Sequence, residues 1–190
     1  MPGAHDCIIS LLDLHAVNDV PGYLAQISAG LIPDGLAVLA FFAGDTLREL
    51  RETFLVAEQE MTGGATPRVA PMIGLQEAGA LLQRAGFALP VADLERLPLR
   101  YGEAMRLMQD IKLLGLSNCL HDRRKSLATP NLLLRAAMLY AERFAMPDGR
   151  LPATVEIAWM LAWKPHPSQQ QPLKPGSAKA RLADALRVKD

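Results

Sequence analysis

The sequence predicts an α/β fold, the second half of a doubly wound sheet with a helical insertion before its last strand. Residues 7–12 are apolar on both alternating faces and residues 36–42 are a fully apolar run, patterns typical of strands that are covered on both faces. A helical stripe lies between them, formed by Val20, Leu24, Ile27 and Leu31. Residues 101–144 then change to helical periodicity, and an apolar run rich in β-branched and aromatic residues follows at 153–163. These segments predict a βαβ unit, inserted helices and a strand that returns to the sheet.

The segments between the second strand and the insertion carry clear boundary signals. Thr46 and Glu49 have the spacing of a capping box and predict the start of a helix there. A shorter helix over residues 78–85 is expected to end at Gly86 in a left-handed cap. Prolines interrupt the extended segment 87–100, which therefore predicts an edge strand.

The chain divides into one partial domain and a tail. We expect the domain to cover residues 1–164, with the helical insertion at about 101–146. Residues 165–190 are rich in Pro, Gln, Lys and Ser, which predicts a flexible C-terminal tail.

Composition limits the partners and the compartment. The 190 residues carry 20 basic and 20 acidic side chains, so there is no net charge to attract nucleic acid in general. There is no apolar run long enough to span a membrane, and no leader pattern. The two cysteines, Cys7 and Cys119, fit neither a metal-ligand spacing nor a disulfide framework. We therefore predict a cytoplasmic protein without a metal site.

Polar residues follow the first strand directly, at the edge where a doubly wound sheet binds its ligands. They are Asp13, His15, Asn18 and Asp19. Two alternatives stay open: Asp19 as the cap of the next helix, and His15 as a hydrogen-bonded structural residue. No residue is assigned a catalytic role.

Several segments resemble a known family. "DCIISLLDLHAVNDVPGYLAQISAGLIPDGLAVLAFF" at residues 6–42 looks like the fourth strand, following helix and fifth strand of class I S-adenosylmethionine (SAM)-dependent methyltransferases. Later stretches resemble the methyltransferase-like assembly factors of respiratory complex I and their bacterial relatives: "GDTLRELR", "GLSN", "DGRLPAT" and "PGSA". The resemblance covers nearly the whole chain. It implies the C-terminal portion of a Rossmann-like methyltransferase sheet, with SAM as cofactor.

The resemblance also implies positions for the ligands. Ser10, Leu11 and Leu12 would line the methionine end of the cofactor, with His15 close by. The substrate-side candidates are Asp13, Asn18, Asp19 and Asn118, although Asn118 fits a helix terminus equally well. Ala16 stands where relatives often carry Trp, which weakens any inference about the substrate side there.

Part of the family's cofactor site has no counterpart in the sequence. The family carries its glycine-rich loop and its ribose-binding carboxylate before the fourth strand, whereas the one glycine pair here, Gly63-Gly64, follows a predicted helix. We therefore expect a truncated methyltransferase and leave open whether it binds SAM or catalyses. The alternatives are a non-catalytic assembly or interaction factor and a carboxyl methyltransferase of the biotin-synthesis type.

The expected partners follow from these predictions. The family implies a protein substrate. We also expect self-association through the exposed first strand, residues 7–12, because a half-sheet leaves that strand without a neighbour.

Overall fold

Four strands form one mixed, open sheet in the order β1-β2-β4-β3. The computed structural model describes residues 3–64, 66–119, 121, 123 and 125–170. The strands are β1 (His5–Leu11), β2 (Leu31–Phe42), β3 (Ala88–Tyr101) and β4 (Leu151–Trp163). The helices are η1 (Leu14–Ala16), α1 (Val20–Gly30), α2 (Arg48–Thr62), α3 (Leu75–Arg84), α4 (Ala104–Leu113) and α5 (Pro130–Phe144).

The strand directions confirm the predicted α/β architecture. β1 and β2 are parallel and are joined by α1, as the βαβ prediction requires. β4 is antiparallel to both β2 and β3 and lies between them, so β3 is the predicted edge strand. The helical insertion is present as α4 and α5.

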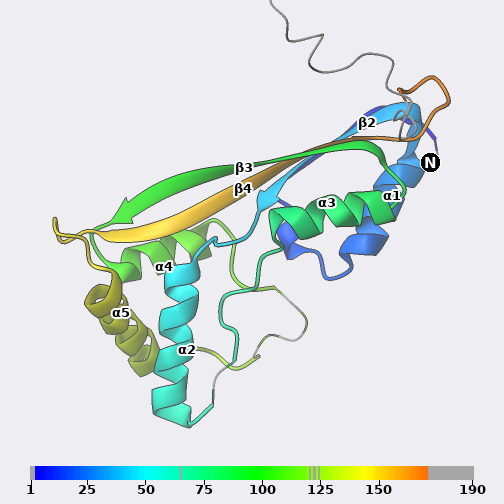
Figure 1. Ribbon diagram of the computed structural model, residues 1–190. Helices are drawn as coiled ribbons and strands as arrows, with labels where there is room; N and C mark the ends of the chain where they lie inside the picture. Colours follow the sequence, from blue (N-terminus) through cyan, green and yellow to red (C-terminus); the bar gives the residue numbers. More distant parts are fainter. Residues whose placement is uncertain (1–2, 65, 120, 122, 124, 171–190) are drawn as a thin grey trace, which may run out of the picture.

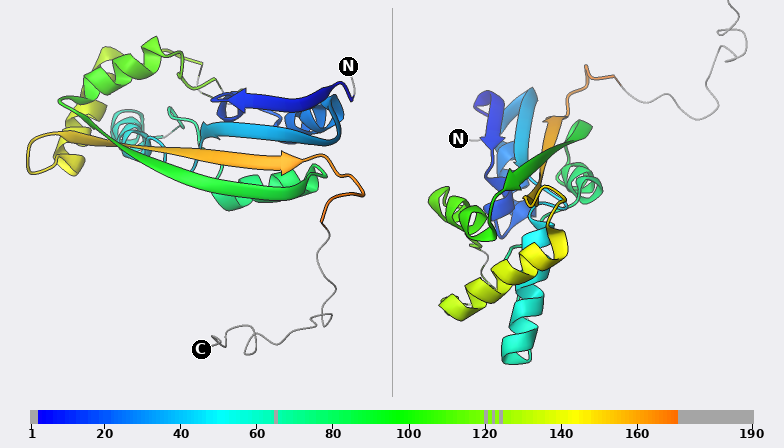
Figure 2. Two further views of the ribbon diagram at one scale, coloured as in Figure 1. Left: turned by 90° about the horizontal axis from the view of Figure 1, so that it is seen from above. Right: turned by 90° about the vertical axis from the view of Figure 1, so that its left-hand side faces the viewer.

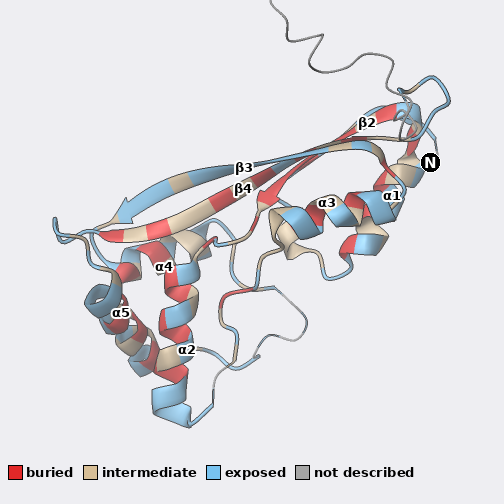
Figure 3. Ribbon diagram, in the orientation of Figure 1, coloured by how far each residue is buried: buried red, intermediate tan, exposed pale blue. Residues whose placement is uncertain are grey.

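The α-helices gather on one side of the sheet (Figures 1 and 2). α1 and α3 pack at the end near the N-terminus, where Leu39, Phe41 and Met160 belong to their hydrophobic core. α2, α4 and α5 pack at the other end around a second core that includes Tyr140. Most of the buried apolar residues of β2 and β4 lie in these two cores (Figure 3). Among the described residues, no helix combines the length and apolar character that a membrane span needs.

The prediction that the first strand is covered on both faces is wrong for the described residues. Ile9 and Leu11 of β1 are 62% and 60% exposed. Their side chains share a face with Val38 and Ala40 of β2, since those residues are paired across the ladder. The described helices cover the opposite face, and this explains the exposure. Cys7, on the same face of β1 as Ile9, is also exposed.

The capping box predicted for α2 is also wrong, because both of its side chains have partners on β4. Thr46 Oγ1 donates to the carbonyl of Ala43 at 2.8 Å and accepts from the backbone N–H of Glu156 at 2.9 Å. Glu49 accepts from the backbone N–H of Thr154 at 3.1 Å. α2 begins after Leu47, whose φ of 55° is left-handed. These contacts fix the start of α2 to β4 instead of capping it locally.

Of two other boundary predictions, one is confirmed and the other falls mostly outside the described residues. Gly86 has a φ of +81° and follows α3, as the left-handed cap requires. Residues 171–190, most of the tail that the sequence predicts to be flexible, are outside the described residues.

Candidate functional site

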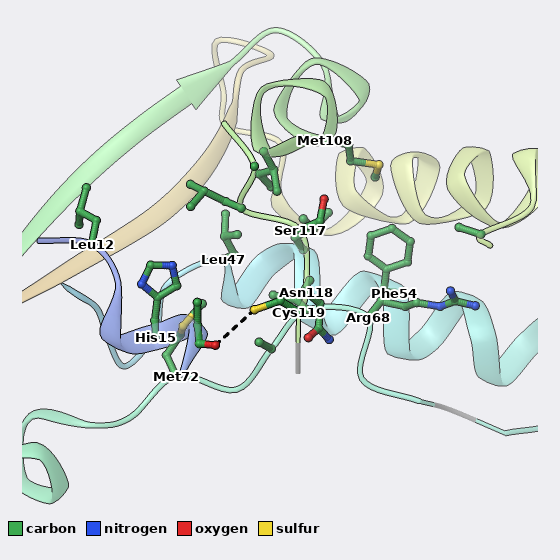
Figure 4. Close-up of a pocket in the computed structure, with 18 of the residues that line it drawn as sticks. Leu12, His15, Leu47, Phe54, Arg68, Met72, Met108, Ser117, Asn118 and Cys119 are labelled. Carbon is green, nitrogen blue, oxygen red and sulfur yellow. Dashed lines mark hydrogen bonds between the residues drawn. The ribbon is translucent and has the colours of Figure 1, made fainter. Parts of the chain in front are cut away.

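A cavity of about 350 Å³ lies where the carboxyl end of β1 meets the helical insertion. One wall comes from Leu12 and η1, a second from α2, and a third from α4 with the loop that follows it. Figure 4 shows His15 on the η1 side and Ser117, Asn118 and Cys119 on the loop. Most of the lining is apolar, including Leu47, Phe54, Met72 and Met108. A mainly apolar cavity with a few polar groups is the usual form of a ligand site.

Three of the eight predicted site residues line this cavity: Leu12, His15 and Asn118. The Asn118 amide donates to the carbonyl of Pro67 at 3.2 Å, and Cys119 Sγ donates to the carbonyl of Ala16 at 3.5 Å. The loop after α4 is therefore tied to both neighbouring walls.

The other five predicted residues lie beside the cavity without lining it. The Tyr23 hydroxyl donates to Ser10 Oγ at 3.0 Å and to Asp13 Oδ2 at 3.1 Å. Asn18 Oδ1 accepts from the backbone N–H of His121 at 3.0 Å. Leu11 points to the open face of the sheet. Asp19 Oδ1 accepts from the N–H of Gly22 at 2.9 Å, so Asp19 caps α1, the alternative that the sequence left open. The functional roles of these residues stay predictions.

His15 lines the cavity, and in the described part of the chain one of its ring nitrogens keeps no hydrogen-bond partner. Its Nδ1 is buried and has no hydrogen-bond partner among the described residues. The ring packs edge-on against Phe42, with 4.9 Å between centroids. Burial lowers the pKa of His15, and the neighbouring Asp13 carboxylate opposes this only in part. His15 is therefore neutral at pH 7, with one ring nitrogen free to accept or donate.

We expect His15 to make the protein less stable in mild acid. Because its folded-state pKa is lowered, the unfolded chain binds more protons, and stability falls as pH drops below about 6.5 toward the lowered pKa. Urea denaturation at several pH values measures this. In His15→Leu this part of the pH dependence should vanish, and an unchanged profile would contradict the assignment.

Arg68 is a cavity residue that the sequence analysis missed. Its Nε donates to Glu58 Oε1 at 2.6 Å, and its Nη1 donates to the carbonyl of Ser126 at 3.1 Å. Glu58 is fully buried and also accepts from the N–H and hydroxyl of Thr66, each at 2.7 Å. Burial alone would raise the pKa of Glu58, but these hydrogen bonds from Thr66 and Arg68 outweigh it and lower the pKa. The Glu58–Arg68 pair therefore holds the segment after α2 in place as one wall of the cavity.

Nothing in the described ranges points to a metal centre. No group of three or more His, Cys, Asp and Glu side chains comes together there. Gly63 is the left-handed cap at the end of α2, with a φ of +70°. The glycine pair thus follows a helix, as the sequence predicts.

The comparisons with solved structures define the class of the fold. The chain superposes on a putative methyltransferase of Bacillus halodurans with a TM-score of 0.52 and 12% identity, over 87% of this chain and 74% of that one. The described chain is therefore part of a class I methyltransferase-like fold, as the resemblance implied, with its cavity at the sheet edge. No family model matches the sequence.

Sequence relatives define the family more narrowly. The chain is homologous to the arginine-hydroxylase NDUFAF5 of Rattus norvegicus, with 42% identity over 97% of this chain and 54% of the relative. It is also homologous to the malonyl-[acyl-carrier protein] O-methyltransferase of Laribacter hongkongensis, with 36% identity over 92% of this chain and 56% of the relative. The chain thus spans about half the length of these curated relatives. Both types named from the sequence, the complex I assembly type and the biotin-synthesis type, are present among its homologues.

The predicted cytoplasmic location is contradicted by these relatives. The NDUFAF5 proteins of Danio rerio, Rattus norvegicus and Homo sapiens are mitochondrial. A low cysteine content is compatible with any reducing compartment, so composition alone did not distinguish them.

Proposed function

We propose that the whole protein is a SAM-dependent enzyme of the methyltransferase type and that this chain supplies its acceptor side. The observation that carries the proposal is the cavity, because it joins the carboxyl end of β1 to the helical insertion. In an open α/β sheet, that edge is the place where ligands bind.

The residues at the end of β1 fit the methionine end of SAM. Leu12 lines the cavity, is partly exposed, and provides an apolar contact. His15 also lines the cavity and provides a polar contact there. Asp13 is exposed, and its carboxylate suits the ammonium group of the methionine end. The glycine pair does not serve the adenosine end as the family's glycine-rich loop does, since Gly63 is the C-cap of α2.

The cavity residues also suit the reaction. Bound SAM supplies an electrophilic methyl group, and the protein then has mainly to align the acceptor with it. The loop at Ser117 and Asn118 and the wall at Arg68 hold an acceptor from the side opposite β1. Neutral His15 can take a proton from an acceptor that carries one.

A second candidate, arginine hydroxylation, is favoured by the 42% identity to the arginine-hydroxylase NDUFAF5 of Rattus norvegicus, against 36% to the O-methyltransferase of Laribacter hongkongensis. The relatives are named for action on arginine in one case and on a malonyl group carried by the acyl-carrier protein in the other. A protein substrate fits either candidate. Methyl transfer and hydroxylation are distinguished by the mass added to the substrate.

Calorimetric titration with SAM tests the proposal that the end of β1 binds this cofactor. We expect weak, saturable binding in the millimolar range, because only one end of the cofactor has a site in the described chain. Leu12→Lys should abolish it, since a charge then occupies the cavity wall. The matched control is Leu99→Lys on β3, because Leu12 and Leu99 are 45% and 41% exposed.

Absence of heat at millimolar SAM would favour the non-catalytic assembly or interaction factor for this chain. If Leu12→Lys and the wild type bind SAM equally well, SAM does not bind at the end of β1.

A further inference from the structure

The loop after α4 bridges two walls of the cavity that come from distant parts of the sequence. On one side, the Asn118 amide donates to the carbonyl of Pro67, in the segment after α2, at 3.2 Å. On the other side, Cys119 Sγ donates to the carbonyl of Ala16 in η1 at 3.5 Å (Figure 4). Ser117, Asn118 and Cys119 line the cavity, so these contacts determine where that wall lies.

Asn18 holds the same loop slightly farther along the chain. Its Oδ1 accepts from the backbone N–H of His121 at 3.0 Å, two residues after Cys119. Asn18 is exposed and lies beside the cavity without lining it. It stands between η1 and α1, so the segment that leads from η1 to α1 holds the loop at two points, Ala16 and Asn18.

The start of the loop is fixed separately, by the end of α4. Gly115 has a φ of +72°, and the N–H of Leu116 donates to the carbonyl of Ile111 at 3.0 Å. This is the hydrogen-bond pattern of a left-handed helix end, and it involves only α4 and the residues that follow it directly. The long-range contacts act beyond this point. Loss of one of them should therefore displace the loop without unwinding α4.

We propose that Asn18 is a positioning residue for the acceptor side of the cavity, acting through the loop after α4 and not by touching a ligand. The Asn18–His121 bond joins the segment that follows the cofactor-side residues Leu12 and His15 to the loop on the acceptor side. It therefore helps to set the spacing between cofactor and acceptor, on which methyl transfer depends. This role rests on the proposed function, because that function assigns the two sides of the cavity.

Amide hydrogen exchange of His121, followed by NMR on the full chain, tests the bond itself. In Asn18→Ala the N–H of His121 loses its acceptor, and its exchange should become about fivefold faster. Asn18→Asp keeps an oxygen at the same position, so its exchange should be no faster than in the wild type. Asn131→Ala, which changes an exposed asparagine on α5, is the matched control and should leave His121 unchanged.

The Cys119 thiol tests whether the bond positions the cavity wall. In a Cys7→Ser background, Cys119 is the one remaining cysteine of the sequence. Its alkylation by iodoacetamide should be at least about twofold faster in Asn18→Ala, because the loop then leaves Ala16 more often. The rate should be unchanged in Asn18→Asp and in Asn131→Ala. Urea denaturation should give the same midpoint for all variants, since Asn18 is exposed.

These measurements use neither SAM nor an acceptor, so their outcome is separate from the SAM titration that tests the proposed function. Equal exchange of His121 in the wild type and Asn18→Ala would show that the bond does not hold the loop. A Cys119 alkylation rate that is the same in the wild type and Asn18→Ala would show that the bond does not position the cavity wall. Either result, or a large loss of global stability in Asn18→Ala, would overturn the positioning role.

Discussion

Replacing Phe41 by alanine is expected to lower the free energy of unfolding by about 4 kcal/mol. Phe41 lies on the helix-covered face of β2 and is only 1% exposed. It packs in the core formed by α1, α3 and the sheet. The substitution removes an aromatic ring from a core that cannot close fully around the gap. Urea denaturation followed by circular dichroism measures the loss.

The neighbouring Phe42 is the matched control, because it lies on the opposite face of the same strand and is half-buried. Phe42→Ala should cost clearly less than Phe41→Ala, although it removes the edge-on contact with His15. Equal losses from the two variants would mean that both faces of the sheet are covered in solution.

Glu58→Gln is expected to destabilise the protein by about 3 kcal/mol. Glu58 is fully buried and accepts from Arg68 Nε, so the substitution leaves a largely buried guanidinium without this counter-charge. Thr66 also loses its carboxylate acceptor. Because Arg68 lines the cavity, the cavity wall should loosen as well. Chemical denaturation gives the stability, and amide hydrogen exchange of the segment after α2 reports on the wall.

The pH dependence provides a second check on Glu58. The folded-state pKa of Glu58 is lowered, so its contribution is present above the unfolded value of about 4.3 and is lost as pH falls through the lowered folded-state pKa. The gap between wild type and Glu58→Gln should therefore shrink in acid. Glu60→Gln breaks the exposed pair with Arg135 and should have little effect. A gap that stays constant in acid would contradict the assigned ion pair.

Local patterns in the sequence predicted most elements, because each depends on residues close together in the chain. The apolar runs became strands, and Gly86 ended α3 as expected. The capping box failed because Thr46 and Glu49 found partners on β4, more than a hundred residues away. The exposure of Ile9 was missed for a related reason. An apolar run predicts that a strand is buried. It does not show which face of the sheet the helices of the chain pack against.

The candidate site was predictable mainly on the side formed by β1, with Asn118 as the one predicted residue on another wall. Leu12 and His15 follow a strand at a ligand-binding edge, which is a local signal. Phe54, Arg68 and Met72 form the opposite wall, and in the sequence they resemble ordinary helix and loop residues. The Glu58–Arg68 pair spans the turn after α2, and no spacing rule predicts such a contact. The shape of the cavity comes from packing between distant segments.

The most direct test of the account is the position of SAM on the chain in solution. Intermolecular nuclear Overhauser effects between the sulfonium methyl group and a selectively labelled chain measure it. We predict contacts with the Leu12 methyl groups and the His15 ring, and none with Leu99 or Val91 on the far edge of the sheet. Contacts confined to β3, or to the open face away from Leu12, would contradict the assignment of the cavity as the functional site.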